Sequence, residues 1–190
     1  MLFCDHLSNQ EVLEAKKTNR EDLLEELLID FRKTFPDLTF ELQLDFSIIN
    51  AQALRLGNNR LVTVYGGLAL HPSLGLDGLT LIVLHEVGHH LAEGCRSKRD
   101  PSLACECVAD HWAVTTGMAN LCLKTDRSLQ MQVAVEELDQ VMGPRQPSKG
   151  EYSKTIKRSG CWAGGWSSRR QALLVRERSP QATGCCISYI

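Results

Sequence analysis

Apolar residues in the first third of the chain change from a helical spacing to an extended one. Between residues 20 and 35 they recur every three or four positions, the spacing of one helix face, so a helix is predicted there. The buried face of that helix is expected to consist of Leu23, Leu24, Leu27, Leu28 and Phe31. Pro36 and Asp37 end the pattern. A weaker helical pattern covers residues 9–17.

Extended segments follow this helix. Residues 38–46 alternate apolar and polar side chains, which predicts a strand with one buried face. Residues 51–56 and 60–65 flank Gly57-Asn58-Asn59, which is typical of a hairpin turn. The sequence therefore predicts a small antiparallel sheet. Its strand at residues 62–65 either packs in the core or pairs with an extended peptide as an added strand.

The most apolar stretch of the chain, residues 77–93, predicts a helix that is buried on nearly all sides. Asp77 is its expected N-cap and Gly94 its expected C-terminal glycine. Asp100-Pro101 is read as the start of a second helix that ends near Gly117.

The C-terminal third predicts less regular structure. A helix is predicted over residues 127–142, with Asp126 as its cap. Residues 143–165 are rich in Gly, Pro, Ser and Lys and are predicted to form a loop. Residues 178–190 are expected to be a poorly ordered tail, which leaves residues 1–177 as a single domain.

The apolar helix carries His85 and His89 four residues apart, with Glu86 beside the first. Positions i and i+4 lie on one helix face about 5.4 Å apart, so both imidazoles can reach one zinc ion. Glu86 would lie near the same ion, where it can take a proton from a water that zinc activates. The alternative is a solvated stripe of histidines. The apolar surroundings count against it, because a buried imidazole needs a partner.

The second predicted helix carries Glu106 and Asp110, again four residues apart. Zinc held by two histidines needs a third protein ligand and an open position for water, and Glu106 can supply that ligand. Asp110 can accept a hydrogen bond from the far nitrogen of a ligand histidine and so orient its ring. Alone, both residues would be read as solvated helix positions. The histidine pair, together with small Ala104, Ala109 and Ala113, favours the ligand interpretation.

The motif His85-Glu86-x-x-His89, followed by Glu106-x-x-x-Asp110, resembles the gluzincin metallopeptidases. It is most similar to the branch of HtpX, the CAAX prenyl proteases and the Oma-type proteases, with their small soluble relatives. The resemblance implies an α+β, zincin-like domain with N-terminal helices and a small sheet, then a zinc helix and a glutamate helix. It also implies one zinc ion per chain, held by His85, His89 and Glu106, with Glu86 as general base in peptide hydrolysis.

The likeness covers about residues 45–117. Within it, residues 50–54 and 62–68 resemble the segment that precedes the zinc helix in that branch. The chain departs from the family further on. Larger members carry a His-Pro pair ahead of an arginine near the C-terminus, which stabilises the oxyanion. Residues 160–174 contain no histidine.

The residue that would stabilise the oxyanion is therefore open. Arg169 or Arg170 resembles the family's arginine, since either would lie just inside a short helix. Tyr152, Tyr65 or one of these arginines could serve. The arginines are equally well explained as the solvated start of that helix.

Composition and charge exclude some classes of protein. A chain of 190 residues with 43% hydrophobic residues can bury one core. A net charge of −2 predicts no nucleic-acid partner. No apolar stretch reaches the ~18–20 residues that span a bilayer, so no transmembrane segment is predicted. The expected partner is a peptide or protein substrate, and no oligomeric state is predicted.

The chain contains eight cysteines. Its N-terminus lacks the basic and apolar regions of a signal peptide, which predicts a cytoplasmic protein with reduced thiols. Several cysteines nevertheless cluster around the active-site half of the chain, namely Cys95, Cys105, Cys107, Cys122 and Cys161. Disulfides there would suit an exported protein, so the redox state stays open.

Three functions are compatible with these patterns. The favoured one is a zinc-dependent peptidase. The alternative is a zinc-binding protein with weak or no catalysis, which serves as a regulatory or binding module. A structural helical domain with a chance motif is the third, and the Glu106 and Asp110 pair counts against it.

Overall fold

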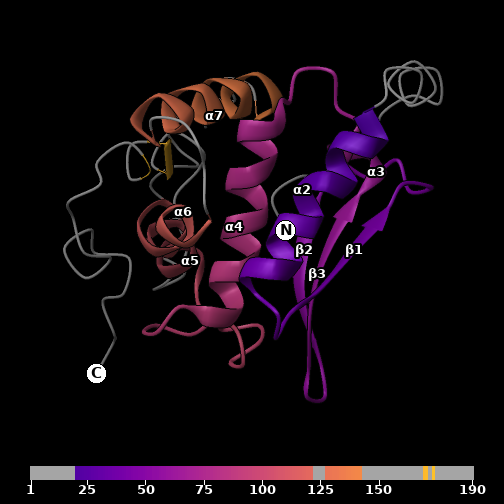
Figure 1. Cartoon of the computed structure of the whole chain (residues 1–190). Helices are drawn as coiled ribbons and strands as arrows, with labels where there is room; N and C mark the ends of the chain where they lie inside the picture. The colour runs from indigo at the N-terminus through magenta and orange to yellow at the C-terminus, as the bar shows by residue number, and fades with distance from the viewer. Residues whose placement is uncertain (1–19, 122–126, 143–168, 171–172, 174–190) are drawn as a thin grey trace, which may run out of the picture.

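The computed structural model describes residues 20–121, 127–142, 169–170 and 173 (Figure 1). Within them the fold is a mixed α+β arrangement of a three-stranded sheet and several helices. The helix predicted over residues 9–17, the loop over 143–165 and the tail over 178–190 lie outside the described residues.

The sheet has the order β1-β3-β2. Strands β2 (Ala51–Leu56) and β3 (Asn59–Tyr65) form the predicted antiparallel hairpin, with Gly57 in the turn at a left-handed φ of 60°. Strand β1 (Thr39–Gln43) runs parallel to β3. The prediction of an antiparallel sheet is therefore wrong for β1. Residues 44–50 carry the chain past the end of β3, so β2 pairs on the far side of β3 from β1.

Strand β3 is the central strand of the sheet, which bears on the expectation that it pairs with a peptide. Strand β3 is hydrogen-bonded to β1 on one side and to β2 on the other. Residues 62–65 therefore have no free edge, and the expectation that they pair with an added peptide strand is wrong. In the described part of the chain, the edges of the sheet are β1 and β2.

Helix α2 (Arg20–Thr34) confirms the first helical pattern. It buries Leu24, Leu28 and Phe31, whose spacing follows one helix face. Leu23 is 45% exposed, because each residue turns about 100° from its neighbour and this leucine lies off the face that Leu24 occupies. The ring of Phe31 packs against Phe40 on β1, with ring centroids 5.6 Å apart.

Helix α4 (Leu76–Leu91) is the buried helix at the centre of the molecule, as its composition predicts. Every residue from 78 to 90 is buried. In Figure 1 α4 stands between the sheet and helices α5 (Glu106–Trp112) and α6 (Met118–Asn120), with α7 (Arg127–Met142) across its N-terminal end. The helix predicted over residues 127–142 is thereby confirmed. The described residues contain no helix with the length and hydrophobicity to cross a membrane.

The predicted caps of α4 are wrong. Gly75 occupies the N-cap position and Ala92 the C-cap, and neither Asp77 nor Gly94 does. At the start of the helix, the backbone nitrogen of Gly78 instead donates a hydrogen bond to Glu137 Oε2 on α7 at 2.7 Å. A tertiary contact thus replaces the local cap.

The second helix starts later than predicted. Residues 96–104 form a turn closed by a bridge between Arg96 and Ala104. The Asp100 carboxylate accepts hydrogen bonds from the backbone nitrogen and the hydroxyl of Ser102, so Asp100 initiates this turn and caps no helix. Helix α5 begins only at Glu106 and continues into a π-helical turn, η1 (Ala113–Gly117). Glu106 is therefore a first-turn residue.

Candidate metal centre

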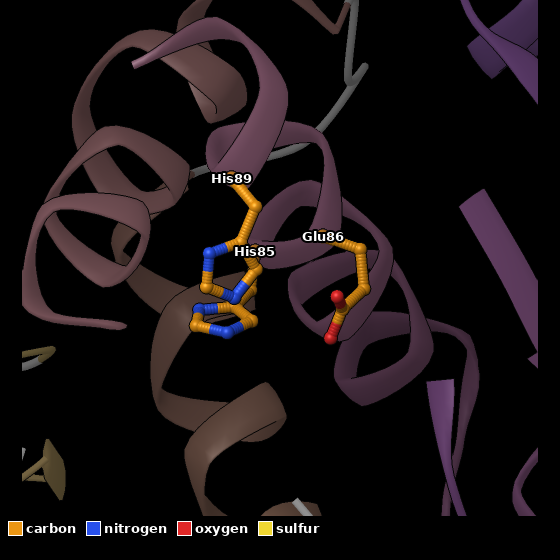
Figure 2. Close-up of side chains that lie close together, drawn as sticks. All are labelled: His85, Glu86 and His89. Atoms are coloured by element: carbon orange, nitrogen blue, oxygen red, sulfur yellow. The ribbon is translucent and has the colours of Figure 1, made fainter. Parts of the chain in front are cut away.

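Helix α4 presents a group of three buried side chains that could hold a metal ion. Ligand atoms of His85, Glu86 and His89 all lie within 4.8 Å of one another. The two imidazole rings are almost perpendicular, with centroids 4.6 Å apart. Figure 2 shows the rings one above the other, with the Glu86 carboxylate beside them. The spacing of the sequence motif thus gives the cluster that it predicts.

A glycine brings α5 against this face of α4. A Cβ atom on Gly88 would lie 2.8 Å from the carbonyl oxygen of Ala109 and 3.0 Å from its Cα atom, too close for any side chain. The two helices therefore contact each other backbone to backbone at this point. Glu106 and Asp110, on either side of Ala109 in the sequence, are held beside the histidines.

Both imidazoles are fixed through Nδ1. His85 Nδ1 lies 2.7 Å from Asp110 Oδ1, and His89 Nδ1 lies 2.8 Å from the carbonyl oxygen of Ala104. Each bond orients a ring and leaves its Nε2 to face a common point. The sequence predicts the role of Asp110 but misses that of Ala104, because a backbone acceptor has no residue-type signal.

Both Nε2 atoms face Glu106. His85 Nε2 lies 3.2 Å from Glu106 Oε2, and His89 Nε2 lies 3.7 Å from Glu106 Oε1. His85 Nε2 is buried and makes no hydrogen bond with any described residue, despite this short distance. Leaving a buried polar atom without a bond is costly, and a metal ion at this point would remove that cost. The donor set therefore fits a divalent ion.

The C-terminal segment adds an arginine to the site. Arg169 Nε donates to Asp110 Oδ2 at 2.8 Å and Nη2 donates to Oδ1 at 2.5 Å, a two-pronged pair. Arg169 Nη1 also lies 3.6 Å from Glu106 Oε2. Arg170 is directed elsewhere, to Asp139 on α7 at 2.7 Å. Of the two arginines that the sequence singles out, only Arg169 reaches the histidine site.

Of the two tyrosines considered for the oxyanion, Tyr65 is the one that the structure describes. Tyr65 ends β3, and its hydroxyl accepts a hydrogen bond from Gln52 on β2. Tyr152 lies outside the described residues. His90 is bound through Nε2 to the carbonyl oxygen of Leu61 at 3.0 Å, so its ring contacts β3.

The charges of the site are strongly coupled. Burial lowers the pKa of His85, but the Asp110 carboxylate outweighs burial and raises that pKa to about 9. Burial raises the pKa of Asp110, but Arg169 and His85 lower it to about 2. Burial also raises the pKa of Glu106, but His85 and Arg169 lower that pKa below its usual value. Burial and the charge of His85 lower the pKa of His89.

These pKa shifts predict that metal uptake releases a proton. At pH 6.5 His85 is protonated, because its pKa is about 9, and Nε2 must lose that proton to bind a metal ion. We expect about one proton released per ion, and an affinity that falls about tenfold per pH unit below the pKa. Calorimetry in buffers of different ionisation enthalpy measures this number.

Asp110→Asn is the control for the proton count. It removes the carboxylate that raises the pKa of His85, so that this variant should release fewer protons per ion at the same pH. Uptake by the wild-type protein with no proton release at pH 6.5 would contradict the expected charge state.

Glu106→Gln is expected to weaken metal binding at least about 100-fold, because the amide keeps the shape of the side chain but removes the ligand charge. Glu93→Gln is the matched control, since Glu93 is exposed and lies two residues beyond the C-terminal end of α4. Competition with a chromophoric chelator measures both affinities. Equal affinities for the two variants would remove Glu106 from the ligand set.

Cysteines flank the site on two segments. Cys95 follows α4, Cys107 follows Glu106, and each takes part in a disulfide bond. The expectation of reduced thiols does not hold for these two residues. The structure agrees instead with the alternative that disulfides form within this group of cysteines.

No family model, curated protein or solved structure matches the chain. Side-chain chemistry is therefore what indicates a function. That chemistry consists of the oriented imidazoles of His85 and His89, the Glu106 carboxylate that faces both, and the buried Glu86 carboxylate beside them.

Proposed function

We propose that this protein is a zinc metallopeptidase of the gluzincin type that hydrolyses peptide bonds. One observation carries the proposal: His85 and His89, each fixed at Nδ1, direct their Nε2 atoms to Glu106 beside the buried carboxylate of Glu86. Two histidines and one glutamate are a known ligand set of hydrolytic zinc sites. Zinc prefers these nitrogen and oxygen ligands, and the set leaves one coordination position for a reactant.

The distances between the donor atoms are compatible with zinc. Zinc–ligand bonds of ~2.1 Å in a tetrahedral arrangement place two ligand atoms about 3.4 Å apart. The two distances from the Nε2 atoms to Glu106 oxygens, 3.2 and 3.7 Å, bracket this value. Only small side-chain movements would be needed to take up the ion.

Each residue then has a defined task. When bound, zinc would supply a Lewis acid that polarises the scissile carbonyl and lowers the pKa of the attacking water. Glu86 would accept a proton from that water and deliver it to the leaving amine. Its side chain is buried, with the residue 4% exposed, so its proton would exchange with the reactants in preference to bulk water. Asp110 and the Ala104 carbonyl would hold the two rings in place.

We assign Arg169 a positioning role. Two of its nitrogens are bound to Asp110, which in turn holds His85. An arginine engaged in this way orients the ligand set and is poorly placed to stabilise an oxyanion. Arg170, bound to Asp139, has no such contact. The described residues thus supply no evident oxyanion donor, and Tyr152 stays a candidate outside them.

This last observation favours a second candidate function. A zinc protein without an oxyanion donor would bind peptides and cleave them slowly or not at all. It would then act as a zinc-dependent binding or regulatory module.

Zinc content and peptide cleavage, measured on the same preparation, test both candidates. One zinc ion per chain with cleavage of a quenched fluorescent peptide library would support the peptidase. Stoichiometric zinc without cleavage would favour the binding module. A protein that takes up no zinc after dialysis against the ion would refute both.

A further inference from the structure

Five basic side chains lie on two segments near the C-terminal end of α4, the helix that carries the two histidines. Arg55 and Arg60 face each other across the hairpin of β2 and β3. The other three belong to the turn of residues 96–104, which follows α4. We refer to these five residues as the basic rim, and its members are Arg55, Arg60, Arg96, Lys98 and Arg99.

The two segments of the basic rim lie close together. Arg60 is near enough to His90, on α4, for their charges to interact. Arg55 and His90 are both near enough to Asp100, in the turn, to do the same. His90 is also bound to the carbonyl oxygen of Leu61 on β3, so the end of the hairpin and the turn both lie by the C-terminal end of α4.

The turn of the basic rim adjoins the metal site directly. The turn ends at Ala104, whose backbone nitrogen donates to the His89 carbonyl oxygen at 2.7 Å and whose own carbonyl oxygen binds the His89 ring. Glu106 follows two residues later, and its side chain is 27% exposed while that of His85 is 4% exposed. The turn of the basic rim therefore ends two residues before Glu106, the more exposed of these two side chains.

The basic rim has an excess of unpaired positive charge. Four of its members are exposed and Arg60 is half-buried, and none of the five forms an ion pair with a described residue. Segments 51–65 and 92–105 contain only two acidic residues, Glu93 and Asp100, and Asp100 is bound to Ser102. The whole chain carries a net charge of −2, so this surface has the opposite sign to the molecule as a whole.

We infer that the basic rim selects peptides that carry aspartate or glutamate beside the bond to be cleaved. This inference rests on the proposed peptidase function and names its substrate class. Unpaired arginine and lysine side chains near the opening of a site attract anionic groups and raise the rate at which they arrive. A peptide is the favoured occupant because the charge adjoins a site with the ligand set of a hydrolase.

The test compares two peptides that differ only in glutamate or glutamine beside the scissile bond. We expect wild-type kcat/KM to be roughly tenfold higher for the glutamate peptide at low salt, with the difference shrinking as salt is added. Lys98→Glu combined with Arg55→Glu should abolish the preference. Lys33→Glu is the control, because it makes the same kind of charge change on α2, where Lys33 pairs with Asp30. Zinc content and Tm confirm that each variant is folded.

Binding separates this inference from the proposed function. Fluorescence anisotropy of labelled peptides with the Glu86→Gln variant reports recognition without cleavage. If no peptide is cleaved but the glutamate peptide binds Glu86→Gln more tightly, the peptidase proposal fails and the basic rim retains its role. Equal kcat/KM and equal binding for the two peptides would overturn the inference. It would also be overturned if an RNA oligonucleotide displaced the peptide at lower concentration than unlabelled peptide does.

Discussion

Glu86→Gln is expected to lower kcat/KM for peptide cleavage by about 10²–10⁴-fold while the zinc content stays at the wild-type level. The amide has the shape of the carboxylate but cannot take the proton from the attacking water. The other three residues of the site keep their contacts, since His85 and His89 are held by Asp110 and the Ala104 carbonyl. Quenched-peptide kinetics and metal analysis on one preparation measure both quantities.

The same variant tests whether Glu86 is a metal ligand and not a general base. Its carboxylate lies within 4.8 Å of the histidine ligand atoms, so a metal ion could in principle bind Glu86 in place of Glu106. Loss of zinc together with activity in Glu86→Gln would then make Glu86 a ligand. Glu93→Gln, the same change at an exposed residue after α4, should leave activity and zinc content unchanged.

The parts of the site that could be predicted from the sequence are the pairs four residues apart on single helices, His85 and His89 on α4 and Glu106 and Asp110 on α5. His85, Glu86 and His89 lie together because helical periodicity brings i and i+4 side by side. The Ala104 carbonyl and Arg169 were harder to foresee. The carbonyl belongs to every residue, and Arg169 lies 59 positions from Asp110, so only the folded chain brings them together. Small residues were the local signal of a close neighbour, since Gly88 on α4 meets Ala109 on α5.

In the fold, too, the features set by local sequence could be predicted, and those set by tertiary contacts could not. The hairpin of β2 and β3 follows from its turn residues, and α4 from its apolar composition. The direction of β1 does not, because alternation of apolar and polar residues is the same in parallel and antiparallel strands. Asp100-Pro101 is compatible with a helix start and with a turn, and the bonds to Ser102 favour the turn.

Arg169→Met is expected to lower the free energy of unfolding of the metal-free protein by about 3 kcal/mol, the loss typical of a broken buried ion pair. The side chains of Arg169 and Asp110 are 10% and 6% exposed, so removal of the guanidinium leaves a buried carboxylate whose only charged partner among the described residues is His85. Arg170→Met is the matched control on the adjacent residue. Its pair with Asp139 is 42% and 34% exposed, and its loss should cost less than about 1 kcal/mol.

The metal affinity of these two variants decides whether Arg169 acts on the site or only on the fold. Asp110 holds the ring of His85, so a carboxylate that has lost Arg169 should orient this ligand less well. We expect Arg169→Met to weaken zinc binding by about 10–100-fold, as loss of a ligand's orienting partner does elsewhere, and Arg170→Met to leave it unchanged. Denaturant unfolding and chelator competition measure the two effects separately. If Arg169→Met is destabilised but binds zinc as tightly as the wild-type protein, this arginine has a structural role only.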